Sequence, residues 1–323
     1  MNNRLNQILL GILVVQLALV GFVFWPRQAG EAKGGPLLGD FQAAAVTGLT
    51  IRDADGNQVT LAKKDEQWVL PDADDFPAQT DRVTEFLDKV EKIQANRLVT
   101  RTEASHKRLK VAENDYNRLL ELTLSGGESR RLFVGSSAGA GATHVRVDPD
   151  PNVYLTNALN VWDADTAVSR WIDTLYFSVP TTATVALKLE NANGVFEFEK
   201  QDDRWTMAGL SAGETLDEDA VRTLVNYAAA VRMTEPLGKT AKASFGLDQP
   251  AAVVTVKTGD GEYTLTFGAP AGTEEKSYVV KASNSDYYVR VSAFTGDTFA
   301  NKTRQDFLKE APTPTPEAEG GGS

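Results

Sequence analysis

The chain repeats itself at a spacing of about 135 residues, and this repeat limits the folds that it can adopt. Three pairs of segments match in their turns and alternating strands: residues 56–70 and 194–207, 122–135 and 254–268, and 144–155 and 278–291. In the first pair Trp68 corresponds to Trp205, and each tryptophan follows a strand and a polar turn. We therefore expect two tandem modules, at residues 46–180 and 181–310.

The hydrophobic periodicity within each module predicts an antiparallel sheet packed by one amphipathic helix. Hairpins are expected at Asp55-Gly56 and Asn193-Gly194, because such pairs tolerate the positive φ angles of tight turns. Apolar residues then recur at helical spacing, at Val83, Phe86, Leu87, Val90 and Ile93 in the first module and at Val221, Leu224, Val225 and Ala228 in the second. Thr215 and Glu218 have the spacing of a capping box before the second helix. With about four further strands per module, the fold class is α+β.

An uninterrupted apolar segment precedes the modules. Residues 8–25 (ILLGILVVQLALVGFVFW) carry no charge, and Pro26 ends any helix there. At about 1.5 Å per residue, such a helix is just long enough to cross a bilayer core. We expect a single transmembrane anchor; the alternative is a cleaved signal peptide, although Arg27-Gln28-Ala29 makes a poor cleavage site.

The remaining segments are expected to be linkers or tails. Residues 1–7 form a short N-terminal tail, residues 26–45 a flexible stalk, and residues 311–323 a disordered tail rich in proline and glycine. Arg4 before the apolar segment and Arg27 after it leave the charge rule for orientation ambiguous. Because large domains translocate largely regardless of charge, we expect a single-pass protein of the cell membrane with most of the chain outside the cytoplasm.

Composition excludes several classes of function. The net charge of -11 disfavours nucleic-acid binding, because an acidic surface repels a phosphate backbone. The chain of 323 residues has no cysteine, so thiol catalysis, disulfides and thiolate metal sites are excluded.

Acidic and histidine-containing segments are candidate metal or catalytic sites, but none carries a complete pattern. Asp53-Ala-Asp55-Gly-Asn57 resembles the opening of a calcium loop, but its glycine is one place early. The aspartates at 72, 74, 75, 148 and 150 fall where turns are expected. His106 and His144 lack further ligands at zinc spacing, and the loop at 135–143 lacks the ending of a P-loop. We therefore expect no catalytic, cofactor or metal site and a protein that is not an enzyme.

The most aromatic segment beyond the apolar one runs from residue 162 to residue 177. Its large side chains predict either internal packing or a surface for a protein partner, because tryptophan and tyrosine dominate interface energetics. The candidate docking residues are Trp162, Trp171, Tyr176 and Phe177. Helical spacing places Val168, Trp171, Ile172 and Leu175 on one face.

A family resemblance follows from these features. Gln67-Trp68 and Arg204-Trp205 each precede an amphipathic helix, and the second copy continues with Ser244-Phe-Gly-Leu-Asp-Gln-Pro250. This pattern resembles the bacterial domain-of-unknown-function family DUF4340 over about residues 40–310. The first copy departs from it, because Leu109-Lys-Val111 has no glycine, and we expect a differently built turn there. The resemblance implies an envelope protein, often encoded beside an ABC-type exporter and a gliding-associated auxiliary protein, with no catalytic residues.

The sequence thus leads to two expectations of function. The first is a noncatalytic, membrane-anchored scaffold or accessory subunit of a membrane complex, with ABC transporter subunits as the expected partners. The second is a module outside the cytoplasm that binds an envelope glycan or peptide. An exposed apolar patch would favour the first, and a deep pocket lined by aromatic residues would favour the second.

Overall fold

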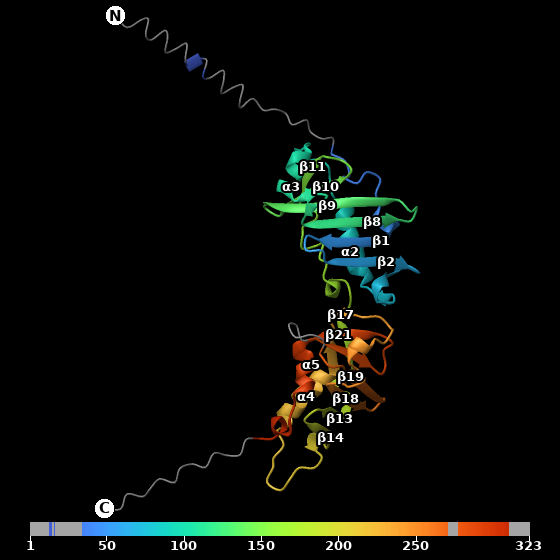
Figure 1. The fold of residues 1–323 in the computed structure, drawn as a ribbon, viewed down its shortest axis with the longest axis vertical. Coiled ribbons are helices and arrows are strands. Elements are labelled where there is room, and N and C mark those ends of the chain that lie inside the picture. The colour runs from blue at the N-terminus through green and yellow to red at the C-terminus, as the bar shows by residue number, and fades with distance from the viewer. Residues whose placement is uncertain (1–12, 15, 17–33, 271–276, 310–323) are drawn as a thin grey trace, which may run out of the picture. The chain divides into compact units, whose positions relative to one another are not determined.

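The computed structural model describes residues 34–270 and 277–309, together with Leu13, Val14 and Gln16. Its fold is mostly β within the α+β class, with two large antiparallel sheets and, in the described residues, four short α-helices (Figure 1). The chain divides into two compact units. The first comprises residues up to Val46, 50–57 and 84–165, and the second comprises residues 47–49, 58–83 and those from 166 onward.

The first large sheet has nine strands in the order β4-β3-β2-β1-β8-β9-β10-β11-β5. They are β1 (Val46–Asp53), β2 (Gln58–Lys64), β3 (Gln67–Leu70), β4 (Phe76–Pro77), β5 (Leu98–Thr100), β8 (Arg118–Leu124), β9 (Ser129–Gly139), β10 (Ala142–Asp148) and β11 (Val153–Thr156). The predicted hairpin at Asp55-Gly56 is confirmed, because residues 54–57 connect β1 to β2 and Gly56 has a φ of 87°.

The second large sheet has eight strands in the order β15-β14-β13-β18-β19-β20-β21-β17. They are β13 (Thr184–Asn191), β14 (Gly194–Gln201), β15 (Arg204–Met207), β17 (Glu235–Pro236), β18 (Ala252–Thr258), β19 (Glu262–Phe267), β20 (Ser277–Ala282) and β21 (Tyr288–Ser292). Asn191 pairs with Gly194 across the predicted turn, which confirms the second hairpin. In both sheets the edge strands have only two to four residues, and β4 and β17 each contain a proline.

One turn is repeated in both sheets in the same unusual conformation. Asp65 and Glu66 connect β2 to β3, and Asp202 and Asp203 connect β14 to β15, all four with positive φ. Two consecutive residues with positive φ match the right-handed twist of a hairpin. The turn therefore places Trp68 and Trp205 at the same position, one residue into the next strand, where both are buried.

The two predicted amphipathic helices are α2 (Thr80–Glu91) and α4 (Glu218–Ala229), and their predicted apolar stripes are buried. The predicted capping box at Thr215 and Glu218 is wrong. Asp217 caps α4 instead, because its carboxylate accepts hydrogen bonds from the backbone N–H groups of Asp219 and Ala220.

The second sheet is packed by two helices rather than by the one predicted. α4 contacts β13, β15 and β18, whereas α5 (Ala293–Ala300) contacts β13, β18, β20 and β21. The remaining helix, α3 (His106–Leu109), lies in the first unit. Phe294 and Phe299 are the large apolar residues of segment 293–300, and they give no helical stripe, which is why the sequence did not reveal α5.

The expectation that the first copy builds its glycine-free turn at Lys110 differently from the second copy is wrong. Gly246, in the Phe-Gly-Leu-Asp element, ends the short helix η6 (Ala243–Phe245) with a φ of 65° and a ψ of 19°. Lys110 ends α3 with a φ of 58° and a ψ of 42°. The turn is thus built in the same left-handed conformation in both copies, and in the first copy a lysine accepts the backbone strain.

Small elements occupy the aromatic segment, and the predicted helical face in it is wrong. Val168–Arg170 forms the 3-10 helix η4, whereas Leu175 begins strand β12 (Leu175–Ser178), which pairs with β16 (Ala230–Arg232). A second short pair joins β6 (Val111–Ala112) to β7 (Asp115–Tyr116). The other 3-10 helices are η1 (Ala43–Ala45), η2 (Pro71–Ala73), η3 (Glu103–Ser105), η5 (Thr181–Ala183) and η7 (Arg304–Phe307).

The two ends of the chain carry predictions that the structure addresses only in part. The apolar segment 8–25 lies outside the described residues except for Leu13, Val14 and Gln16, which are helical, and the tail 311–323 lies outside them entirely. No helix in the described part is both long and apolar enough to span a bilayer. The predicted stalk is too long at its C-terminal end, because Leu38 and Phe41 are buried and Leu37 donates a backbone hydrogen bond to Ile93.

Candidate functional site

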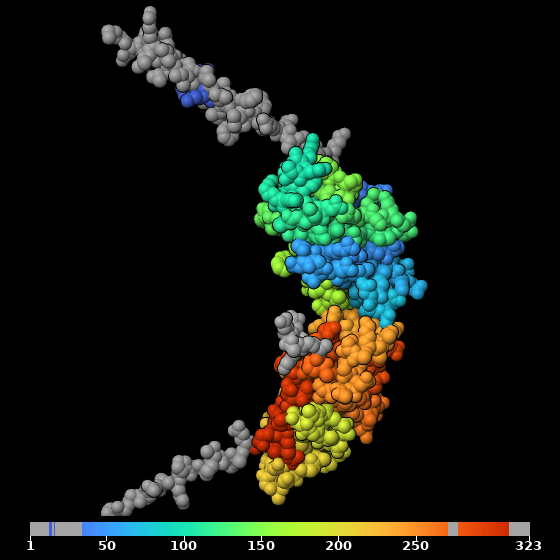
Figure 2. Space-filling view, in the orientation of Figure 1, coloured from blue at the N-terminus to red at the C-terminus, as the bar shows by residue number. Residues whose placement is uncertain are grey.

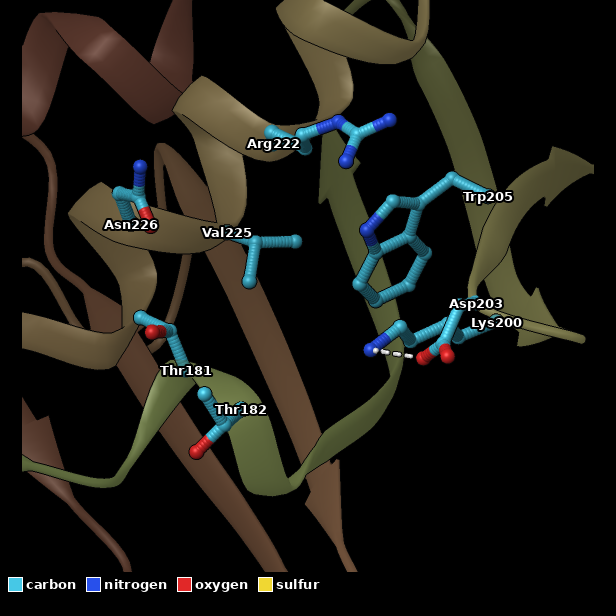
Figure 3. Close-up of a pocket in the computed structure, with 8 residues that line it drawn as sticks. All are labelled: Thr181, Thr182, Lys200, Asp203, Trp205, Arg222, Val225 and Asn226. Atoms are coloured by element: carbon cyan, nitrogen blue, oxygen red, sulfur yellow. Dashed lines mark ion pairs between the residues drawn. The ribbon is translucent and has the colours of Figure 1, made fainter.

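A cavity of about 320 Å³ lies in the second compact unit, where three segments meet (Figure 3). Trp205 and an ion pair from the β14–β15 hairpin lie on one side, and polar side chains from η5 and α4 lie on the other. The lining residues are Thr181 and Thr182 from η5, Lys200, Asp203 and Trp205 from the hairpin, and Arg222, Val225 and Asn226 from α4.

The hairpin positions Trp205. The left-handed turn at Asp202 and Asp203 returns the chain, and Lys200 pairs with Asp203 at 3.1 Å across it. The backbone N–H of Trp205 then donates to the Glu218 carboxylate at 3.4 Å, which fixes the strand against the first turn of α4. The first copy uses the same arrangement, because the backbone N–H of Trp68 donates to the Thr80 hydroxyl at 3.5 Å.

The indole N–H of Trp205 has no partner in the described part of the chain, although the side chain is only 6% exposed. Figure 3 shows this nitrogen on the cavity side of the ring. This nitrogen is not among the fully buried unpartnered atoms of the described residues, so water can reach it, and a ligand in the cavity could replace that water as its acceptor. A free donor therefore faces the cavity.

Paired charges of both signs lie at the same place. Arg222 donates from Nη2 to Glu218 at 3.2 Å and lies 3.7 Å from Asp219 through Nε, so Nη1 keeps no partner among the described residues. Hydrogen bonds from Arg204 lower the pKa of Glu218, which keeps this carboxylate ionised. Arg222, which lines the cavity, is thus held by two carboxylates of its own helix and keeps one terminal nitrogen as an available donor.

Three further polar side chains complete the wall. Thr181, Thr182 and Asn226 make no side-chain hydrogen bond within the described residues. Together with Trp205 and Arg222 they present mostly donors, while Asp203 supplies acceptor oxygens and Val225 an apolar floor. Such a mixture suits a small polar ligand rich in acceptors.

A separate surface of the second unit carries exposed aromatic rings. Phe294 on α5 is 65% exposed and Tyr227 on α4 is 41% exposed, and the two rings meet edge to face at 5.7 Å between centroids. The part of the chain that includes α5, red in Figure 2, reaches the molecular surface. We call this pair the α4–α5 surface.

A hollow of about 690 Å³ adjoins the start of α5. Its walls come from β17, β20, β21 and the first residue of α5, and they include Glu235, Arg290 and Ala293. Arg290 pairs with Glu235 at 2.5 Å and donates to Ser277 at 3.1 Å, so its charge is compensated. Ala293, the last lining residue of the hollow, directly precedes Phe294 in the chain.

The four candidate docking residues have unlike surroundings. Trp162 is 81% exposed, whereas Trp171 and Phe177 are 3% and 1% exposed. The Tyr176 hydroxyl donates to the Tyr287 carbonyl at 2.7 Å and accepts from the backbone N–H of Ala282 at 2.9 Å, and burial raises the pKa of this phenol. Trp162 is therefore the member of this set that a partner could reach without rearrangement.

The residues weighed as metal or catalytic groups make structural contacts. Asp53 accepts hydrogen bonds from the backbone N–H groups of Asp55 and Asn57, which close the β1–β2 turn. His106 Nε2 lies 2.8 Å from the carbonyl of Pro151, and His144 Nδ1 lies 2.8 Å from the carbonyl of Ser136. In the described residues no three acidic or histidine side chains gather as they would around a metal ion.

The aspartates after Trp68 are engaged as well. Within the second unit, the Asp74 carboxylate accepts the backbone N–H of Lys239 at 2.6 Å, and Asp75 pairs with Lys64 at 2.6 Å. Tyr287 donates to the carbonyl groups of both aspartates at 3.3 Å. This cluster therefore forms a packing contact.

Sequence reasoning missed the Trp205 cavity, and a comparison of the two copies holds the signal. In the first copy, Ala43 and Ala44 of η1 stand where the second has Thr181 and Thr182 of η5. Counting from Val83 and Val221 along the two helices, Thr84 and Asp88 stand where the second copy has Arg222 and Asn226. The tryptophan, its turn and the ion pair across the turn (Lys63–Glu66 and Lys200–Asp203) occur in both copies, whereas the polar side chains from η5 and α4 belong to the second copy alone.

Comparison with known proteins gives one family. The family described as a domain of unknown function (DUF4340) matches residues 68–237 and, separately, residues 210–319. Two matches in one chain indicate tandem copies, and together they cover more than half of its length. No curated protein matches the chain, nor does any solved structure. The predicted resemblance is confirmed, and the chain belongs to the DUF4340 family.

Proposed function

We propose that this chain is a noncatalytic, membrane-anchored envelope protein that serves as a scaffold or accessory subunit of a membrane complex. The observation that supports this role is the α4–α5 surface, where Phe294 and Tyr227 expose aromatic rings that contact each other. Exposed aromatic side chains that insert into a pocket of a partner carry much of the binding energy of protein interfaces.

The expected partner is a protein held in the same membrane. The apolar segment 8–25 would tether the chain there, with most of it outside the cytoplasm. A tether raises the effective concentration of a weakly binding surface toward its partner, so that a small aromatic patch suffices. Subunits of an ABC-type transporter are the partners that the family resemblance favours.

The test is cross-linking in intact native cells, followed by purification of the protein from membranes and mass spectrometry. The wild-type chain should recover transporter subunits in stoichiometric amounts. The double variant Tyr227→Ser with Phe294→Ser should lose them. Val195→Ser is the matched control, because Val195 is an exposed apolar residue on β14 and its replacement should leave recovery unchanged.

Trp162→Ser distinguishes the two candidate surfaces. Trp162 lies in the first unit, so a partner held by the α4–α5 surface should still be recovered with this variant. Loss of the partner with Trp162→Ser alone would transfer the docking role to the aromatic segment. Recovery of the wild-type protein without any partner, or full recovery with the folded double variant, would contradict the proposal.

A second candidate function is capture of a ligand outside the cytoplasm, and the Trp205 cavity is the observation that favours it. This role is compatible with the first because the cavity and the α4–α5 surface use different side chains.

A further inference from the structure

We infer that the Trp205 cavity binds a saccharide unit that carries a carboxylate. This inference rests on the second candidate function, ligand capture, and does not depend on the docking role. It starts from the size of the cavity, because about 320 Å³ lies at the lower end of the range for small-molecule sites and admits a single sugar ring.

The unpartnered indole N–H is the first sign of a ligand. Trp205 is buried at the same position of the fold as Trp68 in the first copy. Packing within the fold is therefore enough to account for the burial of its ring. Packing does not supply an acceptor for Nε1, which faces the cavity in Figure 3. A hydroxyl or carboxylate oxygen of a ligand would satisfy this donor.

The second sign is the set of side chains that only the second copy has. The fold itself does not require these side chains, because the first copy folds in the same way with other residues in their place. The second copy has Arg222, Asn226, Thr181 and Thr182 where the first has Thr84, Asp88 and two alanines. In the second copy these four residues line the same hollow from two segments far apart in the sequence. Polar groups that line a concave surface are the usual form of a ligand site.

Arg222 is the group that could receive an acid. Lys200 is paired with Asp203, and Arg222 is paired with Glu218 and Asp219 through Nη2 and Nε, which leaves Nη1 as the charged donor without a partner. The side chain of Arg222 is 54% exposed, and its Nη1 remains free to donate to a carboxylate. Lys200 is partly shielded, with 25% exposure, and Asp203 holds it at the rim.

The uncharged groups favour a sugar over a simple acid. Asn226 and the two threonine hydroxyls can accept hydrogen bonds from ring hydroxyls or donate to them, and Val225 with the indole supplies an apolar wall for a sugar ring. A short acid such as acetate would leave most of these groups unused.

The experiment uses the full chain in detergent micelles, with ligand-observed nuclear magnetic resonance titrations of glucuronate, glucose and acetate. Glucuronate should bind, and glucose and acetate should each bind at least about tenfold more weakly, because each lacks one half of the contacts. Binding of acetate as tight as that of glucuronate would overturn the sugar assignment. Binding of glucose as tight as that of glucuronate would overturn the acid assignment.

Variants then locate the binding. Arg222→Gln should weaken glucuronate about tenfold and leave glucose unchanged, because it removes charge from a half-exposed side chain. Trp205→Phe, which keeps a ring but removes the N–H, should weaken both sugars several-fold, whereas its matched control Trp68→Phe should bind as the wild type does. Unchanged glucuronate affinity in folded Arg222→Gln, or no glucuronate binding to the wild type, would overturn the inference.

The double variant Tyr227→Ser with Phe294→Ser separates this inference from the docking role. It should bind glucuronate with wild-type affinity even though it loses the membrane partner. If it loses both, the cavity and the docking surface are one site, and the inference of an independent saccharide site is wrong.

Discussion

A Cβ atom placed on Gly268 would lie 1.8 Å from the carbonyl oxygen of Phe245, so the chain just after β19 runs directly against the last residue of η6. The first copy repeats this relationship, since a Cβ on Gly135 would lie 2.2 Å from the carbonyl oxygen of Leu109. The two glycines that correspond in the sequence therefore meet the same backbone in each copy.

Gly268→Ala should destabilise the fold by about 2–3 kcal/mol or more, because backbone atoms must move to admit the methyl group. Urea denaturation followed by tryptophan fluorescence measures the change. Gly259→Ala is the control, since a Cβ there meets no atom within 4 Å, and it should shift the midpoint little. Equal midpoints for the two variants would contradict the close approach.

Gly246→Ala should cost about 1–3 kcal/mol, because its φ of 65° is left-handed and the new Cβ would lie 2.8 Å from the Ala269 nitrogen. Lys110→Gly, at the equivalent position, should change the free energy of unfolding by less than about 1 kcal/mol, since relief of strain offsets a more flexible unfolded chain. Thermal unfolding of both variants tests the pair. A large loss of stability in Lys110→Gly would show that its side chain, not its backbone, matters.

Phe307→Ala should destabilise the second copy by about 3–5 kcal/mol. Phe307 is fully buried and meets Phe198 edge to face at 4.9 Å between ring centroids. Phe294→Ala, on the exposed α4–α5 surface, should cost less than about 1 kcal/mol. Denaturant titrations compare them, and a similar cost for both would mean that Phe294 is part of the core.

Stability should fall in alkaline solution as Tyr278 ionises. Burial, together with a hydrogen bond to Asp297, raises the pKa of Tyr278 to about 12. Because the folded pKa lies above the unfolded value of about 10, the contribution of this phenol is complete below pH 10 and is lost as the pH rises toward 12. Unfolding midpoints measured between pH 8 and 12 should decline less steeply in Tyr278→Phe than in the wild type; parallel declines would contradict this role.

Much of the fold follows from the sequence because its signals are local. The hairpins at Gly56 and Gly194, and the stripes of α2 and α4, each depend on residues close together in the chain. Lys110 could not be predicted in the same way, because glycine is the usual marker of a left-handed turn and here the surrounding contacts impose that conformation on a lysine.

The predicted helical face in the aromatic segment was wrong for a different reason. Val168, Trp171 and Leu175 have helical spacing, but they fall in a 3-10 helix, after it and at the start of a strand, and only Trp171 of the three is buried. The Trp205 cavity was beyond local signals altogether, since Thr181, Trp205 and Arg222 come from three separate segments and each is ordinary in its own context. Only the difference between the two copies marks it.

The short edge strands affect how closely many copies of this protein can be packed on one surface without aggregating. β4 and β17 are edge strands of two residues, one of which is a proline. The opposite edges of the two sheets are β5, with three residues, and β15, with four. Proline lacks the N–H that a neighbouring strand would need, and so short a ladder offers few hydrogen bonds to another chain. Many copies crowded on one surface would thus resist joining into continuous intermolecular sheets and aggregating.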